Sequence, residues 1–299
     1  MRLSDMLAGA GVPYTLVQDG DFQILEQCTR IRGQAALTYL EREKFLFTLD
    51  DANITCVICT PELVGKIPAH IAGVVTTNEP KLLFFRFNDR LAAMQAKRPT
   101  EIDPSAKVSP QAWIAPYNVK IGPGTEIQPF VMVDENTEIG ANVRICAGSS
   151  ISAQGFTAVH HGEQIFLAKD AGKTVIEDGV EICVQCDIAR GTLQMDTTRI
   201  GAYTKLDAKV HIGHGSVLGK RVLVPSGAHI AGNCVVGDDV WIGVNATVSN
   251  RIEIGDHAKV SLGSVVTKNI PAGQTVTGNF AIDHARFMKN LKASIEETK

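Results

Sequence analysis

Aromatic residues and long apolar stretches are scarce in this sequence of 299 residues, and its charge is nearly balanced. Phe, Trp and Tyr make up 6% of the residues, so few bulky side chains are available to fill a core. No apolar stretch approaches the roughly 18 residues that a membrane-spanning helix needs, so no membrane span is expected. The formal net charge of −3 indicates no nucleic-acid partner, because proteins that bind polyanions carry basic clusters.

Cysteine usage gives no sign of an extracellular disulfide framework. The seven cysteines are an odd number, which fits a reduced chain in the cytoplasm better than paired disulfides. The first residues, MRLSDMLAGAGVPYTL, are too weakly apolar for a secretory signal, so a cytoplasmic location is expected. Cys-x-x-Cys spacing occurs at 56–59 and 183–186. Residues three apart on a strand face opposite sides, so no metal site is expected there.

Glycine, by contrast, is frequent, and it accompanies a six-residue repeat of aliphatic residues. The chain has 27 glycines, and every sixth residue from Ile200 to Val266 is aliphatic. The same period runs upstream through 102–114, 121–151 and 176–188. It fits neither an α-helix nor an ordinary strand. It fits short strands and tight corners around a three-sided prism, with about 18 residues per coil. A mainly β fold, a parallel β-helix of hexapeptide repeats over residues 101–275, is therefore predicted.

Two breaks interrupt the repeat. Residues 152–174 lack the hexad and are expected to leave the prism as a loop or hairpin. Residues 189–199 keep a 12-residue spacing but lose the aliphatic residue at its midpoint. Insertions in solenoid proteins tend to lie on the binding face, so these segments indicate where a ligand would bind.

Both ends of the chain have another composition. Residues 1–100 predict a small α/β domain, with buried strands in ITCVICTPEL and IAGVVTTN and helices over 39–52 and 79–96. Residues 276–299 predict a C-terminal helical tail. Its apolar stripe of Phe287, Leu291 and Ile295 suits either a cap for the β-helix or a docking face for a partner.

Two histidines in HIGHGSVLG, at 211–219, are the main candidates for chemistry. Ile212 points inward in the hexad frame, so His211 and His214 flank it near a corner. Residues about 18 apart stack in adjacent coils, which places Gly232 after His214 and Asp196 before it. A histidine between a glycine amide and a carboxylate can serve as a general base beside an oxyanion donor. The spacing equally allows surface histidines that fill solenoid corners.

Over nearly its whole length the chain resembles the bacterial UDP-3-O-acylglucosamine N-acyltransferase family of lipid A synthesis. The resemblance rests on ARGTLQMDTT, LDAKVHIGHG, the interruption containing GF, a Tyr/Phe pair in the N-terminal domain and the helical tail. It implies a left-handed β-helix, a homotrimer with active sites in the clefts between subunits, no bound cofactor and no metal. The related UDP-N-acetylglucosamine O-acyltransferases share the His-Ile-small-His element.

The resemblance implies roles for several residues near the histidines. His214 matches the family's catalytic base, which would take a proton from the sugar amine as that nitrogen attacks an acyl thioester. Gly232 matches the glycine whose amide stabilises the oxyanion, and Asp207 matches an aspartate that would orient the base. His211 and Asp196 would line the substrate site. Direct attack leaves no role for a cysteine nucleophile.

The resemblance also implies a nucleotide site in YLEREKF. Tyr39 and Phe45 match the two aromatic residues that sandwich the uracil ring in the family, and stacking of a base is worth about 1–3 kcal/mol. Lys44 would meet phosphate. The alternative interpretation is that Phe45 is merely a core residue of its helix.

Three positions depart from the family pattern. Arg42 stands where the family usually has an asparagine that reads the base, and Ala189 replaces an aspartate before Arg190. Arg251, which follows Asn250 in VSNRIEIG, stands where a second histidine lies near the acyl pocket, and both residues are predicted to bind substrate. An arginine at an acyl pocket suggests a shorter or more polar donor.

Three functions are therefore compared. The favoured one is N-acylation of a nucleotide-activated amino sugar by a thioester of acyl-carrier protein or CoA. The second keeps this chemistry but uses acyl-CoA and a UDP- or dTDP-linked dideoxy amino sugar of surface polysaccharide. The third is a non-catalytic hexapeptide scaffold subunit.

Overall fold

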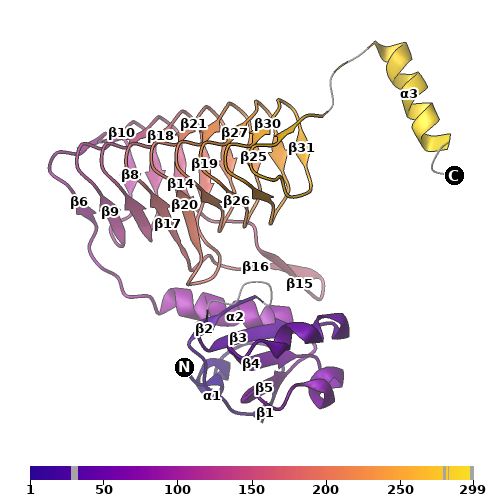
Figure 1. The fold of residues 1–299 in the computed structure, drawn as a ribbon. Coiled ribbons are helices and arrows are strands. Elements are labelled where there is room, and N and C mark those ends of the chain that lie inside the picture. Colours follow the sequence, from indigo (N-terminus) through magenta and orange to yellow (C-terminus); the bar gives the residue numbers. More distant parts are fainter. Residues whose placement is uncertain (28–32, 279–280, 282, 297–299) are drawn as a thin grey trace.

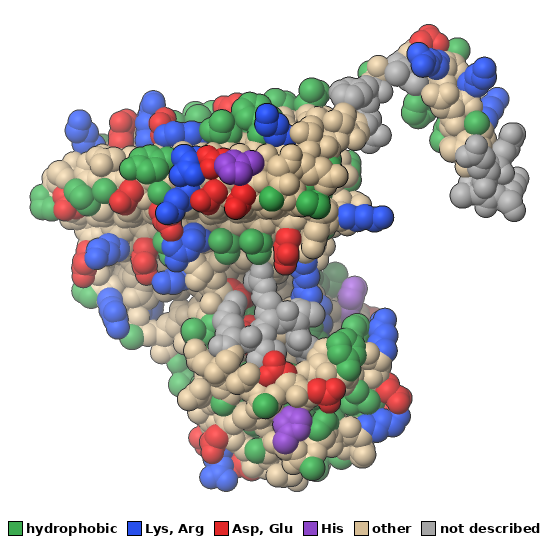
Figure 2. All heavy atoms as spheres, in the orientation of Figure 1, with side chains coloured by type: hydrophobic (Ala, Val, Ile, Leu, Met, Phe, Trp, Pro, Cys, Tyr) green, Lys and Arg blue, Asp and Glu red, His purple; other side chains and the backbone are tan. Residues whose placement is uncertain are grey.

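The computed structural model describes residues 1–27, 33–278, 281 and 283–296. Figure 1 shows a small N-terminal unit beside a long prism of stacked coils, with helix α3 (His284–Glu296) standing away from the end of the prism. Acidic and basic side chains are interspersed over the visible side of the prism, as Figure 2 shows.

The N-terminal domain is a five-stranded sheet packed against helices. The sheet order is β1-β5-β4-β3-β2, in which only the β1–β5 pair is antiparallel. Its strands are β1 (Thr15–Gln18), β2 (Ile24–Leu25), β3 (Ala36–Leu40), β4 (Ile54–Cys59) and β5 (Gly73–Thr76). Its helices are α1 (Leu3–Leu7), α2 (Pro80–Ala93) and the 3₁₀ helices η1 (Glu43–Asp50) and η2 (Pro61–Lys66).

One helix prediction in this domain is partly wrong. The helix predicted over 39–52 begins only at Glu43 and is a 3₁₀ helix, because Tyr39 and Leu40 continue strand β3 and pair with β4. The helix predicted over 79–96 is found as α2. Proline occupies the first turn of α2, where a backbone N–H would have no acceptor within the helix, so its absence costs no hydrogen bond. Three phenylalanines of α2, Phe84, Phe85 and Phe87, fill the core against the sheet.

The rest of the chain, up to Val276, is a left-handed parallel β-helix with three faces. Face I consists of β7 (Lys107–Val108), β10 (Glu126–Ile127), β13 (Arg144–Ile145), β18 (Glu181–Ile182), β21 (Lys205–Leu206), β24 (Leu223–Val224), β27 (Trp241–Ile242), β30 (Lys259–Val260) and β32 (Thr275–Val276). Face II consists of β8 (Trp113–Ile114), β11 (Met132–Val133), β14 (Ser150–Ala153), β19 (Asp187–Ala189), β22 (His211–Ile212), β25 (His229–Ile230), β28 (Thr247–Val248) and β31 (Val265–Val266). Face III consists of β6 (Glu101–Ile102), β9 (Val119–Ile121), β12 (Thr137–Ile139), β17 (Lys173–Ile176), β20 (Thr197–Ile200), β23 (Val217–Leu218), β26 (Val235–Val236) and β29 (Glu253–Ile254).

The predicted hexad forms the core of this β-helix. Every sixth residue from Ile200 to Val266 is at most 6% exposed, and equivalents in successive coils pair in register, as Ile212 does with Ile230. Burial of these stacked aliphatic side chains is the main stabilising contribution, at about 1.5–3 kcal/mol for each fully buried side chain. The same inward stacking turns the intervening residues outward, which positions them for binding.

The first break in the repeat is a hairpin that ties the β-helix to the N-terminal domain. Strands β15 (Ala158–His161) and β16 (Gln164–Leu167) pair in antiparallel fashion, and the hairpin lies on α2 (Figure 1). Asn88 of α2 donates to the carbonyls of Lys169 and Thr192, at 2.8 and 3.1 Å. The Glu79 carboxylate oxygen Oε1 lies 2.6 Å from His161 Nδ1, which is hydrogen-bonding distance. These contacts hold the N-terminal domain next to the corner between faces II and III.

Helix α3 does not cap the β-helix of its own chain. Its apolar stripe is exposed, with Phe287, Leu291 and Ile295 at 52, 40 and 52%, so the capping interpretation is wrong for this chain. A single amphipathic helix keeps its apolar stripe in water unless another surface covers it. Among the described residues, no helix combines the length and apolar character needed to cross a membrane.

Candidate active site

His214 lies at the corner between faces II and III, and both neighbouring coils fix its backbone. Its carbonyl accepts a hydrogen bond from the Asn233 amide of the next coil at 2.7 Å. The amide of Gly215 donates to Thr198 Oγ1 of the preceding coil at 2.8 Å. A side chain carried by such a corner is held in position before any ligand arrives.

The His214 imidazole lies between two glycines. A Cβ atom on Gly232 would stand 2.6 Å from His214 Nε2, and one on Gly155 would stand 3.4 Å from its Cδ2. The Gly232 position therefore requires the close backbone approach that glycine alone allows, whereas a Cβ on Gly155 would make an ordinary van der Waals contact with the ring. In the part of the chain that the structure describes, the Gly232 amide makes no backbone or side-chain hydrogen bond. The structure thus brings together His214 and Gly232, as the stacking of adjacent coils predicted.

Two hollows meet at His214. The domain-side hollow has a volume of about 370 Å³ and extends toward the N-terminal domain; its walls include Glu26, Gln27, Asp196, Asn233 and Arg251. The face II hollow has a volume of about 400 Å³, and its walls include Asp187, His211, His229, Gly232 and Thr247. Because His214 lines both, its imidazole can contact two molecules that approach from different sides.

A third hollow, here called the aromatic pocket, adjoins the domain-side hollow. It has a volume of about 290 Å³ and is lined by Tyr39, Arg42, Phe45, Gln27 and Arg251, together with two further residues of the same segment. It shares Gln27 and Arg251 with the domain-side hollow. A ligand bound by the aromatic side chains can therefore extend toward His214.

The aromatic residues of this pocket are placed for contact with a ligand. Phe45 is 43% exposed, so the interpretation of Phe45 as a core residue is wrong. Tyr39 is held by Phe84, with ring centroids 5.0 Å apart. Lys44 does not line the pocket; its Nζ lies 5.0 Å from the centroid of the Phe45 ring. The expectation that Lys44 meets phosphate is therefore not supported, because its ammonium group is directed to the neighbouring ring.

Arg251 does not lie on the side where it was expected. It lines the aromatic pocket and the domain-side hollow and is absent from the walls of the face II hollow. Its Nη2 donates to Gln27 Oε1 at 2.7 Å, which bridges the β-helix and the N-terminal domain. The suggestion of a polar donor that rested on Arg251 loses its basis. Asn250 is exposed and lines none of the three hollows.

Asp207 is not the carboxylate next to the base within one chain. It is exposed at the corner between faces I and II, where its Oδ1 accepts from the Ala208 amide at 2.7 Å. Seven residues span more than one hexad, so strand β22 separates Asp207 from His214. Asp196, in contrast, is 6% exposed and lines the domain-side hollow together with His214.

A polar row on face II was only partly predicted. His211 Nδ1 lies 2.8 Å from Asp187 Oδ2, and the ring of His211 lies 6.1 Å from that of His229. His229 follows His211 by one coil, so its spacing could have revealed it. Asp187 precedes His211 by 24 residues because the second break adds chain between them. A fixed coil length therefore could not find this partner.

Three buried cysteines, Cys56, Cys59 and Cys186, line none of the three hollows. Burial raises the pKa of Cys56 and of Cys59, both on β4, to about 11, and it does the same for Cys186. Thiols with a raised pKa are poor nucleophiles near neutral pH, because the thiolate is the reactive form.

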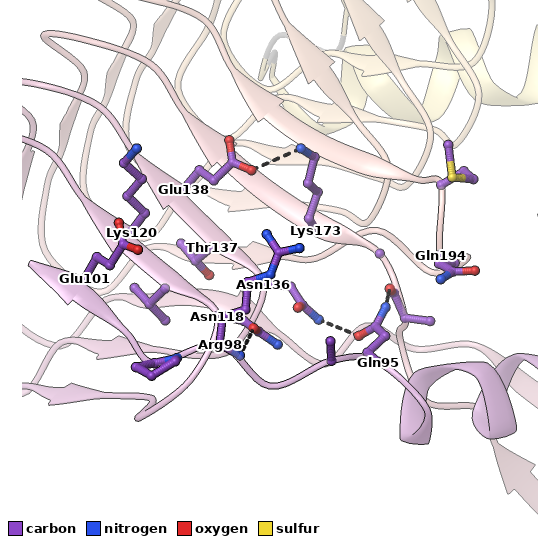
Figure 3. Close-up of a pocket in the computed structure, with 16 residues that line it drawn as sticks. Gln95, Arg98, Glu101, Asn118, Lys120, Asn136, Thr137, Glu138, Lys173 and Gln194 are labelled. Carbon is purple, nitrogen blue, oxygen red and sulfur yellow. Dashed lines mark hydrogen bonds and ion pairs between the residues drawn. The ribbon is translucent and has the colours of Figure 1, made fainter.

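A hollow of about 720 Å³, larger than the three described above, lies elsewhere. It separates the linker around Arg98 from face III, and Figure 3 shows the charged residues that line it. Lys173 pairs with Glu138 at 3.1 Å, and Asn136 donates to Gln95 at 2.9 Å. None of the predicted site residues lines it, so its size does not mark it as the reaction site.

Comparisons with known proteins match this architecture. The family model of bacterial transferase hexapeptide repeats matches residues 118–153, and that of the hexapeptide repeat of succinyl-transferase matches residues 234–268. The UDP-3-O-acylglucosamine N-acyltransferase of Helicobacter hepaticus is 30% identical over 216 residues, which cover 64% of each chain. This chain thus spans less than two thirds of that relative's length.

Two acyltransferases that are named for UDP-N-acetylglucosamine are also similar. The acyl-(acyl-carrier-protein)–UDP-N-acetylglucosamine O-acyltransferase of Saccharophagus degradans is 33% identical over 133 residues, which cover 42% of this chain and 49% of that protein. Among solved structures, the UDP-N-acetylglucosamine acyltransferase of Francisella novicida has a TM-score of 0.50 and 26% identity, and the match covers 64% of this chain and 71% of that one.

Proposed function

We propose that this chain, a left-handed β-helix acyltransferase with hexapeptide repeats like those of the UDP-3-O-acylglucosamine N-acyltransferases, N-acylates a nucleotide-activated amino sugar from a carrier thioester. One observation carries the proposal: His214 lines two hollows, one of which continues into an aromatic pocket. A group-transfer enzyme needs such a base between its acceptor and its donor.

The acceptor would occupy the aromatic pocket and the domain-side hollow. Its base would stack on Tyr39 and Phe45, and the guanidinium groups of Arg42 and Arg251 would meet its phosphates, for which their fork of donors is suited. Because Arg251 lines both spaces, the sugar that follows the diphosphate would enter the domain-side hollow. Its amine would then face His214.

The chemistry follows from the placement of His214 and Gly232. The amine nitrogen forms a bond to the thioester carbonyl carbon while His214 accepts a proton from that nitrogen. The resulting oxyanion would receive a hydrogen bond from the Gly232 amide, which has no other partner in the described part of the chain. Collapse of the tetrahedral intermediate breaks the carbon–sulfur bond, and the imidazolium returns a proton to the departing thiolate.

The donor would reach His214 through the face II hollow. Its thioester would belong to acyl-carrier protein or CoA, and no bound cofactor is part of the proposal. The similar protein of Saccharophagus degradans is named for an acyl-carrier-protein donor, which supports this donor class. We also propose that the chain works in the cytoplasm as a homotrimer, in which the exposed Asp207 of one copy is available to a neighbouring site.

One observation favours the second candidate function, transfer of a short acyl group from acyl-CoA to a UDP- or dTDP-linked dideoxy amino sugar. The walls of the face II hollow carry Asp187, His211, His229 and Thr247, which are polar. A long alkyl chain buried against these groups would remove them from water without new hydrogen bonds. A short acyl group avoids that cost.

Product formation from a matrix of donors and acceptors tests the proposal. UDP-3-O-acylglucosamine and UDP- and dTDP-linked dideoxy amino sugars are each combined with acyl-carrier-protein and CoA thioesters of short and long chain, and products are identified by mass spectrometry. We expect an N-acylated sugar from at least one pair. Absence of any product, together with no shift of the melting temperature by UDP, dTDP or CoA, would support the scaffold hypothesis instead, since bound ligands stabilise the folded state.

A further inference from the structure

Asp170 is a buried carboxylate beside the candidate base, and the reaction proposed above does not use it. Asp170 is 4% exposed, and its Oδ2 accepts a hydrogen bond from the Gly155 amide. The Asp170 amide donates to Gln154 Oε1 at 3.1 Å, and Gln154 Nε2 donates to the Ala168 carbonyl at 2.8 Å. Together these bonds close the base of the hairpin excursion.

The closed base of the excursion forms a wall of the site. A Cβ atom on Gly155 would lie 2.9 Å from Asp170 Oδ2 and 3.4 Å from both Cβ and Cδ2 of His214. One glycine therefore separates the carboxylate from the imidazole. Gly155 and His214 line the face II hollow together, so a change in the position of this glycine changes the space beside the imidazole.

The surroundings of Asp170 indicate that its ionised form does not stabilise the folded state. Burial raises the pKa of Asp170 to about 6, and the nearby Asp196 adds to this, although the Gly155 amide, the Thr192 hydroxyl and Arg190 act in the opposite direction. On the outer side of the same leg, Asp89 of α2 accepts from the Lys169 amide at 2.8 Å. An acid whose pKa is raised by folding destabilises the fold once it ionises, so stability falls as the pH rises through about 6.

We propose that Asp170 is a positioning residue of the candidate active site, which holds the Gly155 backbone against the His214 imidazole and supplies negative charge that favours the imidazolium form. Its role in catalysis rests on the proposed function, whereas its effect on His214 does not. A buried negative charge near a histidine favours the protonated ring. This ring is the form that His214 takes after it accepts a proton from the acceptor.

Three variants separate the effect of the Asp170 charge, the effect of its hydrogen bond from the Gly155 amide, and a general effect on the excursion. Asp170→Asn keeps an oxygen that accepts from Gly155 but removes the charge, and Asp170→Ala removes both. Asp89→Asn is the matched control, because it removes a carboxylate of α2 that accepts a hydrogen bond from Lys169, the residue next to Asp170, and not from Gly155. Selective ¹³C labelling of histidine gives the pKa of each imidazole by NMR, and the signal of His214 is assigned by its loss in His214→Gln.

The expected results differ between the variants. Asp170→Asn lowers the pKa of His214 by about half a unit or more, while Asp89→Asn leaves it unchanged. Asp170→Asn also melts at or above the wild-type temperature at pH 8 and loses that advantage at pH 5, where Asp170 of the wild type is protonated. Asp170→Ala lowers kcat about tenfold or more with a KM for the sugar nucleotide within threefold. Asp170→Asn retains more of the wild-type kcat at pH 8.

Other outcomes would overturn the inference. An unchanged pKa of His214 in Asp170→Asn would remove the electrostatic role. Equal falls in melting temperature for Asp170→Asn at pH 5 and pH 8 would indicate a purely structural role. If instead the wild type shows no acyl transfer while Asp170→Asn still shifts the pKa of His214, the proposed function fails and the coupling of Asp170 to His214 stands.

Discussion

Two histidines at corners of the same β-helix, His214 and His257, have very different surroundings. His214 lies two residues after the inward-facing Ile212, and His257 lies three residues after the inward-facing Ile254, one position further round its corner. The His257 amide donates to the Asp238 carbonyl of the preceding coil. Its side chain, however, is 71% exposed, and its Nδ1 lies 3.8 Å from Asp239. Only the corner of His214 is covered by the excursion and faces the N-terminal domain.

This difference shows that the coil supplies rigidity and the departures from the coil supply the site. Hexapeptide repeats place a side chain at each corner in a similar way, whatever its chemistry. The excursion adds Gly155 beside His214, and the N-terminal domain adds Gln27 and the aromatic pocket. A corner becomes a candidate for catalysis when these segments enclose it.

The largest expected effect separates the two histidines directly. His214→Ala removes the proposed base, so the acyl-transfer rate should fall about 10²- to 10⁴-fold. His257→Ala should leave the rate within about twofold, because His257 contacts neither hollow. Steady-state rates with the best donor and acceptor measure both. Equal rates for His214→Ala and the wild type would contradict the assignment of the base.

A methyl group at Gly232 should disturb the same corner with the imidazole retained. In Gly232→Ala the new Cβ would stand 2.6 Å from His214 Nε2, so the ring must move. Misplacement of a catalytic group by about 1 Å costs about 10²-fold in rate. Gly65→Ala is a suitable control, because a Cβ there meets no atom within 4 Å. A Gly232→Ala protein with the wild-type rate would show that the ring position is not critical.

Two neighbouring residues, Phe45 in the aromatic pocket and Lys44 outside it, test how the acceptor is bound. Phe45→Ala should weaken binding of the sugar nucleotide roughly 5- to 150-fold, which corresponds to the loss of one base stack of about 1–3 kcal/mol. Lys44→Ala should change affinity by less than about twofold, since Lys44 lies over the Phe45 ring and outside the pocket. Isothermal titration with UDP and dTDP measures both. Comparable losses in the two variants would argue against stacking.

The smallest effect concerns the polar row on face II. Asp187→Asn weakens the interaction that holds His211, so the ratio of rates with short and long acyl donors should change about threefold. Asp239→Asn, which alters a pair with Arg221 at another corner, is the matched control and should leave the ratio unchanged. Competition between the two donors in one reaction gives the ratio. An unchanged ratio in Asp187→Asn would remove the polar row from donor selection.

The local part of the site could be predicted from spacing. Gly232 follows His214 by one regular coil, and the structure places the two in contact. Asp207 was suggested by the family resemblance and not by spacing, and it lies at another corner of the prism than His214, because contact between coils depends on position around the prism. Arg251 was placed correctly on the β-helix, but the N-terminal domain that it contacts through Gln27 is 224 residues away in sequence.

Other contributors to the site could not be placed by spacing. Asp170 and Gly155 lie in the excursion, where the six-residue period is lost, so no spacing relates either to His214. Phe45 was attributed to a helix whose exposed side could not be known, because η1 is a 3₁₀ helix that starts after Tyr39 and Leu40 have joined the sheet. Local patterns report which residues are apolar, and they do not report which distant segment packs beside them.

By itself the sequence determined the β-helix, because a six-residue period of aliphatic side chains can be buried in only one way, by stacking coil upon coil. It thereby determined which residues point outward at each corner. Only the tertiary structure decided which corner is enclosed and which way Arg251 and Phe45 face. Those outcomes depend on the docking of α2 and the hairpin onto the prism, which rests on contacts such as Asn88 to Thr192 between residues far apart in the chain.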